Sequence, residues 1–463
     1  MPAAAPRLAE GPRKATLGGE LAWASGSFAT GALFNGMALF ALFFMTTFLG
    51  IEPAVAGTII LVTRIYDGII DPVIGAVSDR TNHRWGPRRI YLLIGAIGLG
   101  ASFALFFNQP VVEGFSTAIM TTLILMLYST AYSVFTIPYL AMPPEMAPSY
   151  DGRTRLMSFR VFFQMAGVIG GSVGAPLLVQ ATGGDLAGYQ TMGIVLGLLA
   201  LILCLVVFFG AARLPRFERP AAPPSDSTLQ LLASPFVDCA KVIGNAPFRL
   251  LTLVKLCQLA VLSTVLACTP YFFGFVLNMG QDQIGQYFLF FGMSGILSIP
   301  MFRWIIQKFG KRESYITLII LYGIGLATWY LWEPGEAEIW FAVRAICIGV
   351  CSTGTLLCAL AMLPDTMEYD RLKSGESREG VMSGVFTFVE NVAGALGPFI
   401  VGLLLQANGL IQTRDMTVEQ PAAVLEAVQW GVSLVPAIFC LLCVPLLFAY
   451  RLDDTKLQQM RSE

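Results

Sequence analysis

The sequence predicts an all-α integral membrane protein that crosses the bilayer with twelve helices, and three observations support this. Of its 463 residues, 56% are hydrophobic and only 13% are charged, whereas about a quarter of the residues in an average soluble protein are charged. The apolar residues also fall in runs of about 20, the length that an α-helix needs to cross the hydrocarbon core. A very apolar soluble enzyme does not explain runs of this length and number.

Twelve such runs can be placed along the chain, and a polar, proline-broken connector separates the sixth from the seventh. We therefore expect an N-terminal half of six helices (1–212), a cytoplasmic linker (213–245) and a C-terminal half of six helices (246–463). The expected spans are 22–49, 54–78, 89–108, 117–142, 158–181, 190–210, 247–277, 284–306, 314–332, 338–362, 382–406 and 428–450.

The positions of the lysines and arginines predict the orientation, because these residues are retained on the cytoplasmic side. If both termini are cytoplasmic, most of the 29 lysines and arginines fall in inner segments, and the outer loops hold only Arg414. We therefore expect a multi-pass protein of a plasma membrane or a bacterial inner membrane, with both termini in the cytoplasm.

Composition and motifs also make several functions improbable. A net charge of −1 gives no general attraction to nucleic acid. Eight of the nine cysteines lie in apolar runs, and the chain has one histidine, so we expect no disulfide framework and no zinc site. No HExxH, GxSxG or GxxxxGK[ST] motif is present, so we expect neither an enzyme nor an ATP-driven pump, and no cofactor.

The two halves repeat one another. Leu140–Met146 is similar to Leu360–Thr366, and Tyr150-Asp151 is echoed by Tyr369-Asp370, at an offset of about 220 residues. Two parallel six-helix repeats are the plan of a rocker-type transporter, in which the substrate site lies between the repeats near the middle of the bilayer. We therefore expect two pseudo-symmetric halves and a small-molecule substrate.

The second span carries charges where an apolar helix should have none. Asp67 and Asp71 are four residues apart and share one helical face, with Arg64 one turn before Asp67. Charges at membrane depth are costly and usually mark the path of an ion or substrate. Two carboxylates in a low dielectric repel one another unless a cation or a proton lies between them. The pair predicts a sodium site or a proton acceptor; a static Arg–Asp cluster that only joins helices is the alternative.

Three motifs resemble those of one transporter family. They are Arg64-x-Tyr66-Asp67-x-x-x-Asp71-Pro72 with Gly75 and Asp79, the basic loop ending in Gly86-Pro87-Arg88-Arg89, and Leu363-Pro364-Asp365-Thr366-x-Glu368-Tyr369-Asp370. Over essentially its whole length the chain resembles the major facilitator superfamily, and within it the glycoside–pentoside–hexuronide:cation symporters, whose type member is the melibiose permease.

The resemblance implies the major facilitator fold and cation-coupled symport, by alternating access, of a small polar solute such as a sugar, a glycoside or a uronide. It also implies that Asp67 and Asp71 bind the coupling ion, Na⁺ or H⁺, and we expect a monomer. Two alternatives stay open: the same family includes lysolipid symporters, and a membrane receptor that transports nothing is a third class.

The fourth span should complete the ion site. The family places an aspartate just before Ile137-Pro138-Tyr139, but this chain has Thr136 there, with Ser133 one turn earlier. Hydroxyl oxygens suit a hard cation, but the missing carboxylate leaves Na⁺ and H⁺ both open. The alternative is that these two hydroxyls only pack helices together.

The substrate site differs most from the family. A lysine–aspartate pair of the first helix is replaced by Thr30-Gly31, and a lysine of the eleventh helix by Asn391. Buried sugar hydroxyls need polar partners, so other residues must supply them, and we expect these to be Arg64, Tyr139, Arg160, Gln164, Glu390, Asn391, Lys255 and Arg344.

Two of these residues, Lys255 and Arg344, would suit an anionic substrate. The alternatives are that Lys255 snorkels to the membrane surface and that Arg344 pairs with a neighbouring group.

Charged residues at the cytoplasmic ends of the spans predict an inner gate. Asp79 ends the second span where the eleventh begins, so its carboxylate can bind the positive N-terminus of that helix. The expected gate residues are Asp79, Arg80, Arg88, Arg89, Glu145, Asp365, Glu368 and Asp370. For the arginines, a role in topology alone is the alternative.

Overall fold

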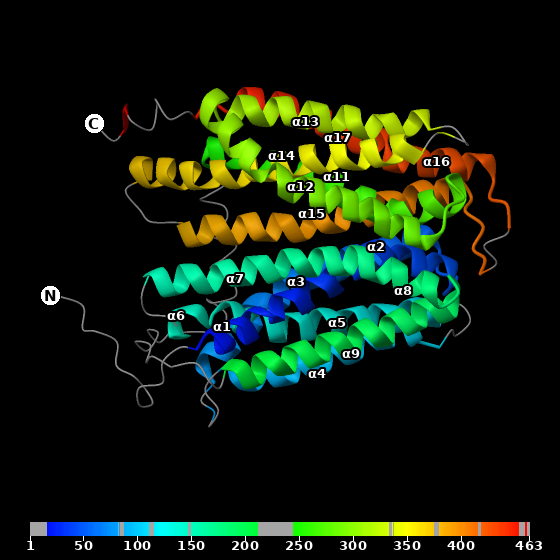
Figure 1. The fold of residues 1–463 in the computed structure, drawn as a ribbon, viewed down its shortest axis with the longest axis horizontal. Coiled ribbons are helices and arrows are strands. Elements are labelled where there is room, and N and C mark those ends of the chain that lie inside the picture. Colours follow the sequence, from blue (N-terminus) through cyan, green and yellow to red (C-terminus); the bar gives the residue numbers. More distant parts are fainter. Residues whose placement is uncertain are drawn as a thin grey trace. The chain divides into compact units, whose positions relative to one another are not determined.

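The computed structural model is built of long helices, and no strand occurs in the part of the chain that it describes (Figure 1). The backbone is described for residues 16–81, 83, 88–110, 115–146, 150–211, 244–332, 336, 338–374, 379–414, 418–452 and 459–460. A few side chains at helix ends, among them those of Asp79, Arg80 and Glu145, lie outside the description. Most of the expected linker and Arg84–Pro87 also lie outside it.

The helices before the linker form six spans. A break at Ser25 divides the first span, and a π-helical turn (Gly170–Gly174) interrupts the fifth. The helices are α1 (Leu17–Ala24), α2 (Gly26–Thr47), α3 (Pro53–Arg80), α4 (Arg89–Asn108), α5 (Phe115–Leu140), α6 (Pro143–Met146), α7 (Tyr150–Ile169), α8 (Ala175–Ala181) and α9 (Leu186–Ala211).

The helices after the linker form six more spans. A π-helical turn (Phe272–Val276) follows the seventh span, a 3₁₀ turn (Thr328–Leu331) follows the ninth, and a break at Ser433 divides the twelfth. The helices are α11 (Ala246–Tyr271), α12 (Gln281–Phe309), α13 (Lys311–Ala327), α14 (Glu338–Ser374), α15 (Glu379–Ala407), α16 (Ala422–Val432) and α17 (Leu434–Ala449).

The described residues contain 12 helical stretches long and apolar enough to cross a membrane, which confirms the predicted number of spans. The chain is therefore a multi-pass membrane protein. Some predicted boundaries are wrong: α7 begins eight residues before the expected fifth span and α16 six residues before the expected twelfth. The largest difference is at the tenth span, which was expected to end at residue 362, whereas α14 continues to Ser374. Two tertiary contacts hold this extension, since Asp365 pairs with Lys311 and Asp370 accepts a hydrogen bond from Asn245.

Contacts within the chain group it into two compact units. The first comprises Met1–Phe44 and Ile65–Ser225, and the second comprises Met45–Arg64 and Asp226–Glu463. In the first unit α4 packs against α5 and α9, and in the second α11 packs against α15 and α17 while α12 and α13 pack against α14. The units divide inside the expected linker, except that residues 45–64 group with the second unit.

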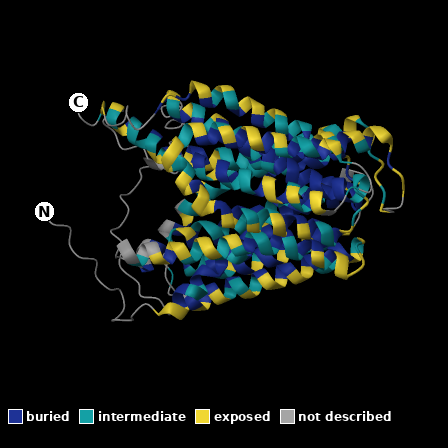
Figure 2. Ribbon diagram, turned by 45° about the horizontal axis from the view of Figure 1, so that its top comes forward, coloured by how far each residue is buried: buried dark blue, intermediate teal, exposed yellow. Residues whose placement is uncertain are grey.

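Small residues let helices approach closely within each unit, as is usual in membranes. A Cβ atom built on Gly100 of α4 would lie 2.6 Å from the carbonyl oxygen of Gly197 in α9. In the second unit, Gly397 of α15 packs directly on the backbone of Ser263 and Thr264 in α11. Exposed apolar positions such as Leu297, which is 73% exposed, alternate with buried ones along the helices (Figure 2). This pattern suits helices that are packed on one side and covered by lipid on the other.

Candidate functional site

Two polar contacts join α3, which carries the paired carboxylates, to α5. Asp67 is buried, and Ser133 on α5 donates a hydrogen bond from Oγ to Asp71 Oδ1 at 2.5 Å. On the same two helices, the hydroxyls of Tyr66 and Thr130 are 2.8 Å apart. The second and fourth spans, α3 and α5, are therefore joined by polar contacts in the region where the sequence predicts the ion site.

Thr136 brings a further oxygen to α5, one turn beyond Ser133. Its Oγ1 atom is buried and accepts or donates no hydrogen bond within the described structure. Leaving a buried hydroxyl unpaired costs free energy, so a ligand that binds it gains that free energy. Asp71 and Ser133 are in contact, and Asp67 and Thr136 lie one turn from them on the same two helices. Oxygen donors of this kind suit a hard cation or a proton. The described residues contain no cluster of three or more His, Cys, Asp or Glu side chains able to hold a metal.

Two prolines near this cluster were not recognised as part of the site from the sequence. Pro72 lies inside α3 and Pro138 inside α5, and both helices continue through them. Proline has no backbone N–H, so the carbonyl oxygen four residues earlier loses its usual helical donor. These carbonyls belong to Gly68 and Val134, which adjoin Asp67 and Ser133 in the chain. The sequence contains the signal, since Pro72 lies four residues after Gly68 and Pro138 lies four residues after Val134.

Tyr139 lies in the packing core of the first unit. Its side chain is 1% exposed and stacks on Trp23 with the ring centroids 4.6 Å apart. Its hydroxyl contacts Ser27 Oγ at 2.9 Å and donates to the carbonyl oxygen of Trp23 at 3.1 Å. The expectation that Tyr139 contacts substrate is therefore corrected, because its ring and hydroxyl are already used to join α5 to α1 and α2.

Arg160 and Gln164 lie one turn apart on α7, and both are half-buried. The Nε atom of Arg160 is buried and has no hydrogen-bond partner within the described structure. The backbone of α7 comes so near to α2 that a Cβ atom on Gly31 would lie 2.9 Å from the carbonyl oxygen of Gln164. This contact explains why the position where the family carries an aspartate is a glycine here.

Lys255 and Glu390 form an ion pair in the interior of the second unit. Lys255 Nζ on α11 lies 3.2 Å from Glu390 Oε1 on α15, and the two side chains are 1% and 38% exposed. The ammonium also lies 5.3 Å from the centre of the Phe386 ring. The alternative that Lys255 snorkels to the membrane surface is therefore wrong. Asn391, next to Glu390, is half-buried.

Gln258, one turn beyond Lys255, has partners at both ends of its amide. Tyr315 donates to Gln258 Oε1 at 2.6 Å, and Gln258 Nε2 donates to Thr355 Oγ1 at 2.9 Å. Because all three side chains are buried, this chain of hydrogen bonds fixes α11 against α13 and α14 next to the ion pair.

Arg344 is held by a different acid. Its guanidinium donates to both oxygens of Glu336, at 2.6 and 2.9 Å, and lies 5.3 and 5.4 Å from the rings of Trp329 and Trp332. A bidentate pair of this kind is geometrically specific. The structure therefore supports the alternative that Arg344 pairs with a neighbouring group.

Arg64 is half-buried on α3, one turn before Asp67, as the sequence placed it. Glu368 is half-buried on the C-terminal extension of α14. For both residues the predicted role stays a prediction, as it does for Asp79, Arg80 and Glu145, whose side chains lie outside the described residues.

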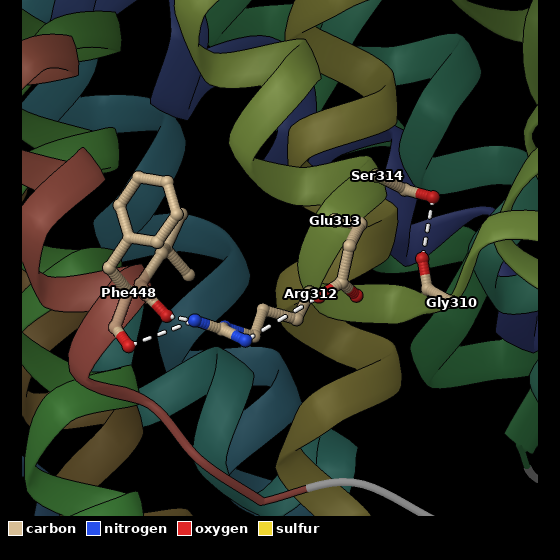
Figure 3. A network of polar contacts seen from close by, with 6 residues as sticks. Gly310, Arg312, Glu313, Ser314 and Phe448 are labelled. Atoms are coloured by element: carbon tan, nitrogen blue, oxygen red, sulfur yellow. Dashed lines mark hydrogen bonds and ion pairs between the residues drawn. The ribbon is translucent and has the colours of Figure 1, made fainter.

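Two arginines cap the last helix of their own unit. Arg89 at the start of α4 donates to the carbonyl oxygen of Phe208 near the end of α9 at 3.0 Å, with its guanidinium 4.9 Å from that ring. Arg312 at the start of α13 donates to the carbonyls of Leu447 and Phe448 at the end of α17, each at 2.9 Å (Figure 3). The last carbonyls of a helix lack helical donors and carry partial negative charge, so arginine suits them.

The residues just before these arginines also bind within their unit. Arg88 donates to the carbonyl oxygen of Ala141, and Lys311 Nζ lies 2.6 Å from Asp365 Oδ2. Asp370 accepts a hydrogen bond at 3.0 Å from Asn245, the residue that caps α11. These contacts follow the internal repeat, since Arg88 and Lys311 are about 220 residues apart. The equivalent role of Arg312 was not recognised from the sequence.

Comparisons with known proteins agree with this architecture. A family model described as "MFS/sugar transport protein" matches residues 22–454. The putative glycoside/cation symporter YagG of Escherichia coli K12 is 25% identical, over 96% of this chain and 94% of its own. The glucuronide carrier protein homolog of the same organism is 26% identical, over 91% and 90%. The solved structure of a bacterial homologue of the lysosomal transporter Spinster has a TM-score of 0.70 at 13% identity, covering 93% and 96%, which shows the same fold.

Proposed function

The chain belongs to the MFS/sugar transport protein family, and on this premise we propose that it is a cation-coupled symporter of a sugar, a glycoside or a uronide. It works by alternating access: when ion and solute are both bound, the protein can change between its outward-open and inward-open states. The printed names of its relatives support the solute class, since one is a putative glycoside/cation symporter and another a glucuronide carrier homologue.

The observation that carries the proposal is the polar junction between α3 and α5. Asp67 is buried, and Asp71 accepts a 2.5 Å hydrogen bond from Ser133. Two carboxylates at one site in a low dielectric require a positive charge between them. A sodium ion or a proton supplies that charge. When the ion has left, Arg64, one turn before Asp67, can pair with the Asp67 carboxylate.

The oxygens of this site define its ion chemistry. Asp67 and Asp71 supply carboxylates, Ser133 and Thr136 supply hydroxyls, and the proline-freed carbonyls of Gly68 and Val134 lie beside them in the chain. Such a set suits Na⁺, which is bound by oxygen ligands, and it equally provides a carboxylate for H⁺. Replacement of the third family aspartate by Thr136 lowers the negative charge that the site offers.

The experiment is ion-driven uptake by the full-length protein in proteoliposomes. A panel of sugars, glycosides and uronides is offered under an inward Na⁺ gradient, an inward H⁺ gradient, or neither. We expect accumulation of at least one solute above its external concentration under one of the two gradients. Equal, non-concentrative entry under all three conditions would show a facilitator, and entry of no member of the panel would remove the sugar assignment.

A further inference from the structure

The ion pair of the second unit takes no part in the ion site of α3 and α5. Lys255 is a fully buried cation inside a membrane-spanning helix, which is costly and is usually kept for a function. Its salt-bridge partner is Glu390 at 3.2 Å, and the side chain of Glu390 is 38% exposed. The pair is therefore asymmetric: the lysine side chain is enclosed, while more than a third of the glutamate side chain is exposed.

We propose that Lys255 is an anchor for a carboxylate on the transported sugar, and that Glu390 is an internal counter-ion which this carboxylate displaces. The inference rests on the proposed function and makes it more specific, because it selects sugar acids from the wider group of sugars and glycosides.

Displacement keeps the charge balance of the buried lysine. Removing one partner of a buried ion pair is strongly destabilising, because it leaves an uncompensated charge. A sugar carboxylate that takes the place of Glu390 replaces one ion pair by another, and the Glu390 side chain is already partly exposed. A neutral sugar offers no such replacement, so it binds only where Lys255 and Glu390 stay paired. The pair thereby discriminates against neutral sugars.

The face of α15 that carries Glu390 has room and polar groups for a ligand. Thr387 and Gly394 lie one turn on either side of Glu390 on the same helical face, and Asn391 adjoins it in the chain. A Cβ atom at Gly394 would meet nothing within 4 Å. Hydroxyl and amide groups of this kind bind sugar hydroxyls. On α11, the hydrogen bonds of Gln258 to Tyr315 and Thr355 fix the helix that carries Lys255. The ammonium is therefore held in place before a ligand arrives.

The test is binding of D-glucuronate and of methyl glucoside to the purified full-length protein, measured by titration calorimetry. We expect the wild type to prefer the acid, and Lys255→Gln to lose about tenfold or more of its affinity for the acid with no change for the neutral sugar, as loss of a charged hydrogen bond implies. Glu390→Gln removes the competing carboxylate, so the affinity for the acid should rise by about tenfold.

Two further variants separate this role from a structural one. The double variant Lys255→Gln with Glu390→Gln keeps a neutral hydrogen-bonding pair, so the protein should fold while the preference for the acid disappears. Arg344→Gln removes another paired cation of the same unit, and it should leave the ratio of acid to neutral affinity unchanged.

The outcomes are distinguishable. If Lys255→Gln leaves the ratio unchanged, or if the wild type binds no acid from a panel of glucuronate, galacturonate and methyl glucuronide, the anchor role is overturned. Competition by a lysophosphatidate where sugar acids fail would overturn the assignment to sugar acids. Binding of the acid without ion-driven accumulation would refute symport while supporting the Lys255 site. Ion-driven accumulation with no preference for the acid would support symport while refuting the Lys255 site.

Discussion

Replacing Ser133 by alanine tests the ion site through a single hydroxyl. Ser133 is 3% exposed and donates to Asp71 Oδ1 at 2.5 Å, so the variant removes one donor to a carboxylate without changing the charge of the site. A hydrogen bond to a charged group contributes about 1.5–3 kcal/mol, which corresponds to about a ten- to hundredfold change in an equilibrium constant. That hydrogen bond stabilises the charged, ion-free carboxylate. If protons drive uptake, its loss should therefore lower the half-saturating proton concentration by about tenfold; if Na⁺ drives uptake, the loss of an oxygen ligand should raise the half-saturating Na⁺ concentration by a similar factor.

The assay measures sugar uptake by proteoliposomes as a function of Na⁺ concentration, or of pH if protons drive uptake. Thr130→Ala is the matched control, because the Thr130 hydroxyl joins the same two helices through Tyr66 at 2.8 Å but touches no carboxylate. The control should lose about 1 kcal/mol of stability and keep the wild-type half-saturating concentration. An unchanged value in Ser133→Ala, or an equal change in Thr130→Ala, would refute the assignment of Ser133 to the ion site.

Three further predictions follow from other parts of the structure. Gly394→Leu should abolish sugar binding, because it fills the space beside Glu390 in which a Cβ atom meets nothing within 4 Å; wild-type sugar affinity would contradict the position of the substrate. Arg312→Ala should lower the free energy of unfolding by about 1 kcal/mol through two lost carbonyl contacts, whereas Glu313→Ala, which loses an exposed contact at 3.5 Å, should change the unfolding midpoint little. Tyr139→Phe should lower the unfolding midpoint, because it loses a buried hydroxyl with two partners, and should leave the relative uptake of different sugars unchanged; altered selectivity would return Tyr139 to the substrate site.

Composition and local spacing were sufficient to predict the spans and to place the two carboxylates of α3 on one helical face. Runs of about 20 apolar residues predict membrane helices whatever the tertiary structure, and the four-residue spacing of Asp67 and Asp71 fixes a common face of one helix. The contact of Asp71 with Ser133 was foreseen only as a resemblance to the family. The end of the tenth span was not foreseen, because partners distant in sequence, Lys311 and Asn245, hold its acidic extension in helix.

Pairings across the fold could not be read from the chain. Glu390 lies 135 residues after Lys255, and no local pattern joins them, so the choice between snorkelling and an ion pair needed the structure. Glu336 precedes Arg344 by eight residues and lies outside its helix, so helical spacing gave no indication of that pair. The close approach of α7 to Gly31 depends on helix packing, and the sequence showed only that a family aspartate was missing.

The central claim is that Asp67 and Asp71 couple solute movement to a cation gradient. The most direct measurement is accumulation of the transported sugar by proteoliposomes under a Na⁺ or an H⁺ gradient, for the wild type, Asp67→Asn and Asp71→Asn. The account predicts that the wild type concentrates the sugar and that each variant loses concentrative uptake while it still binds the sugar. Wild-type accumulation by both variants would contradict the account.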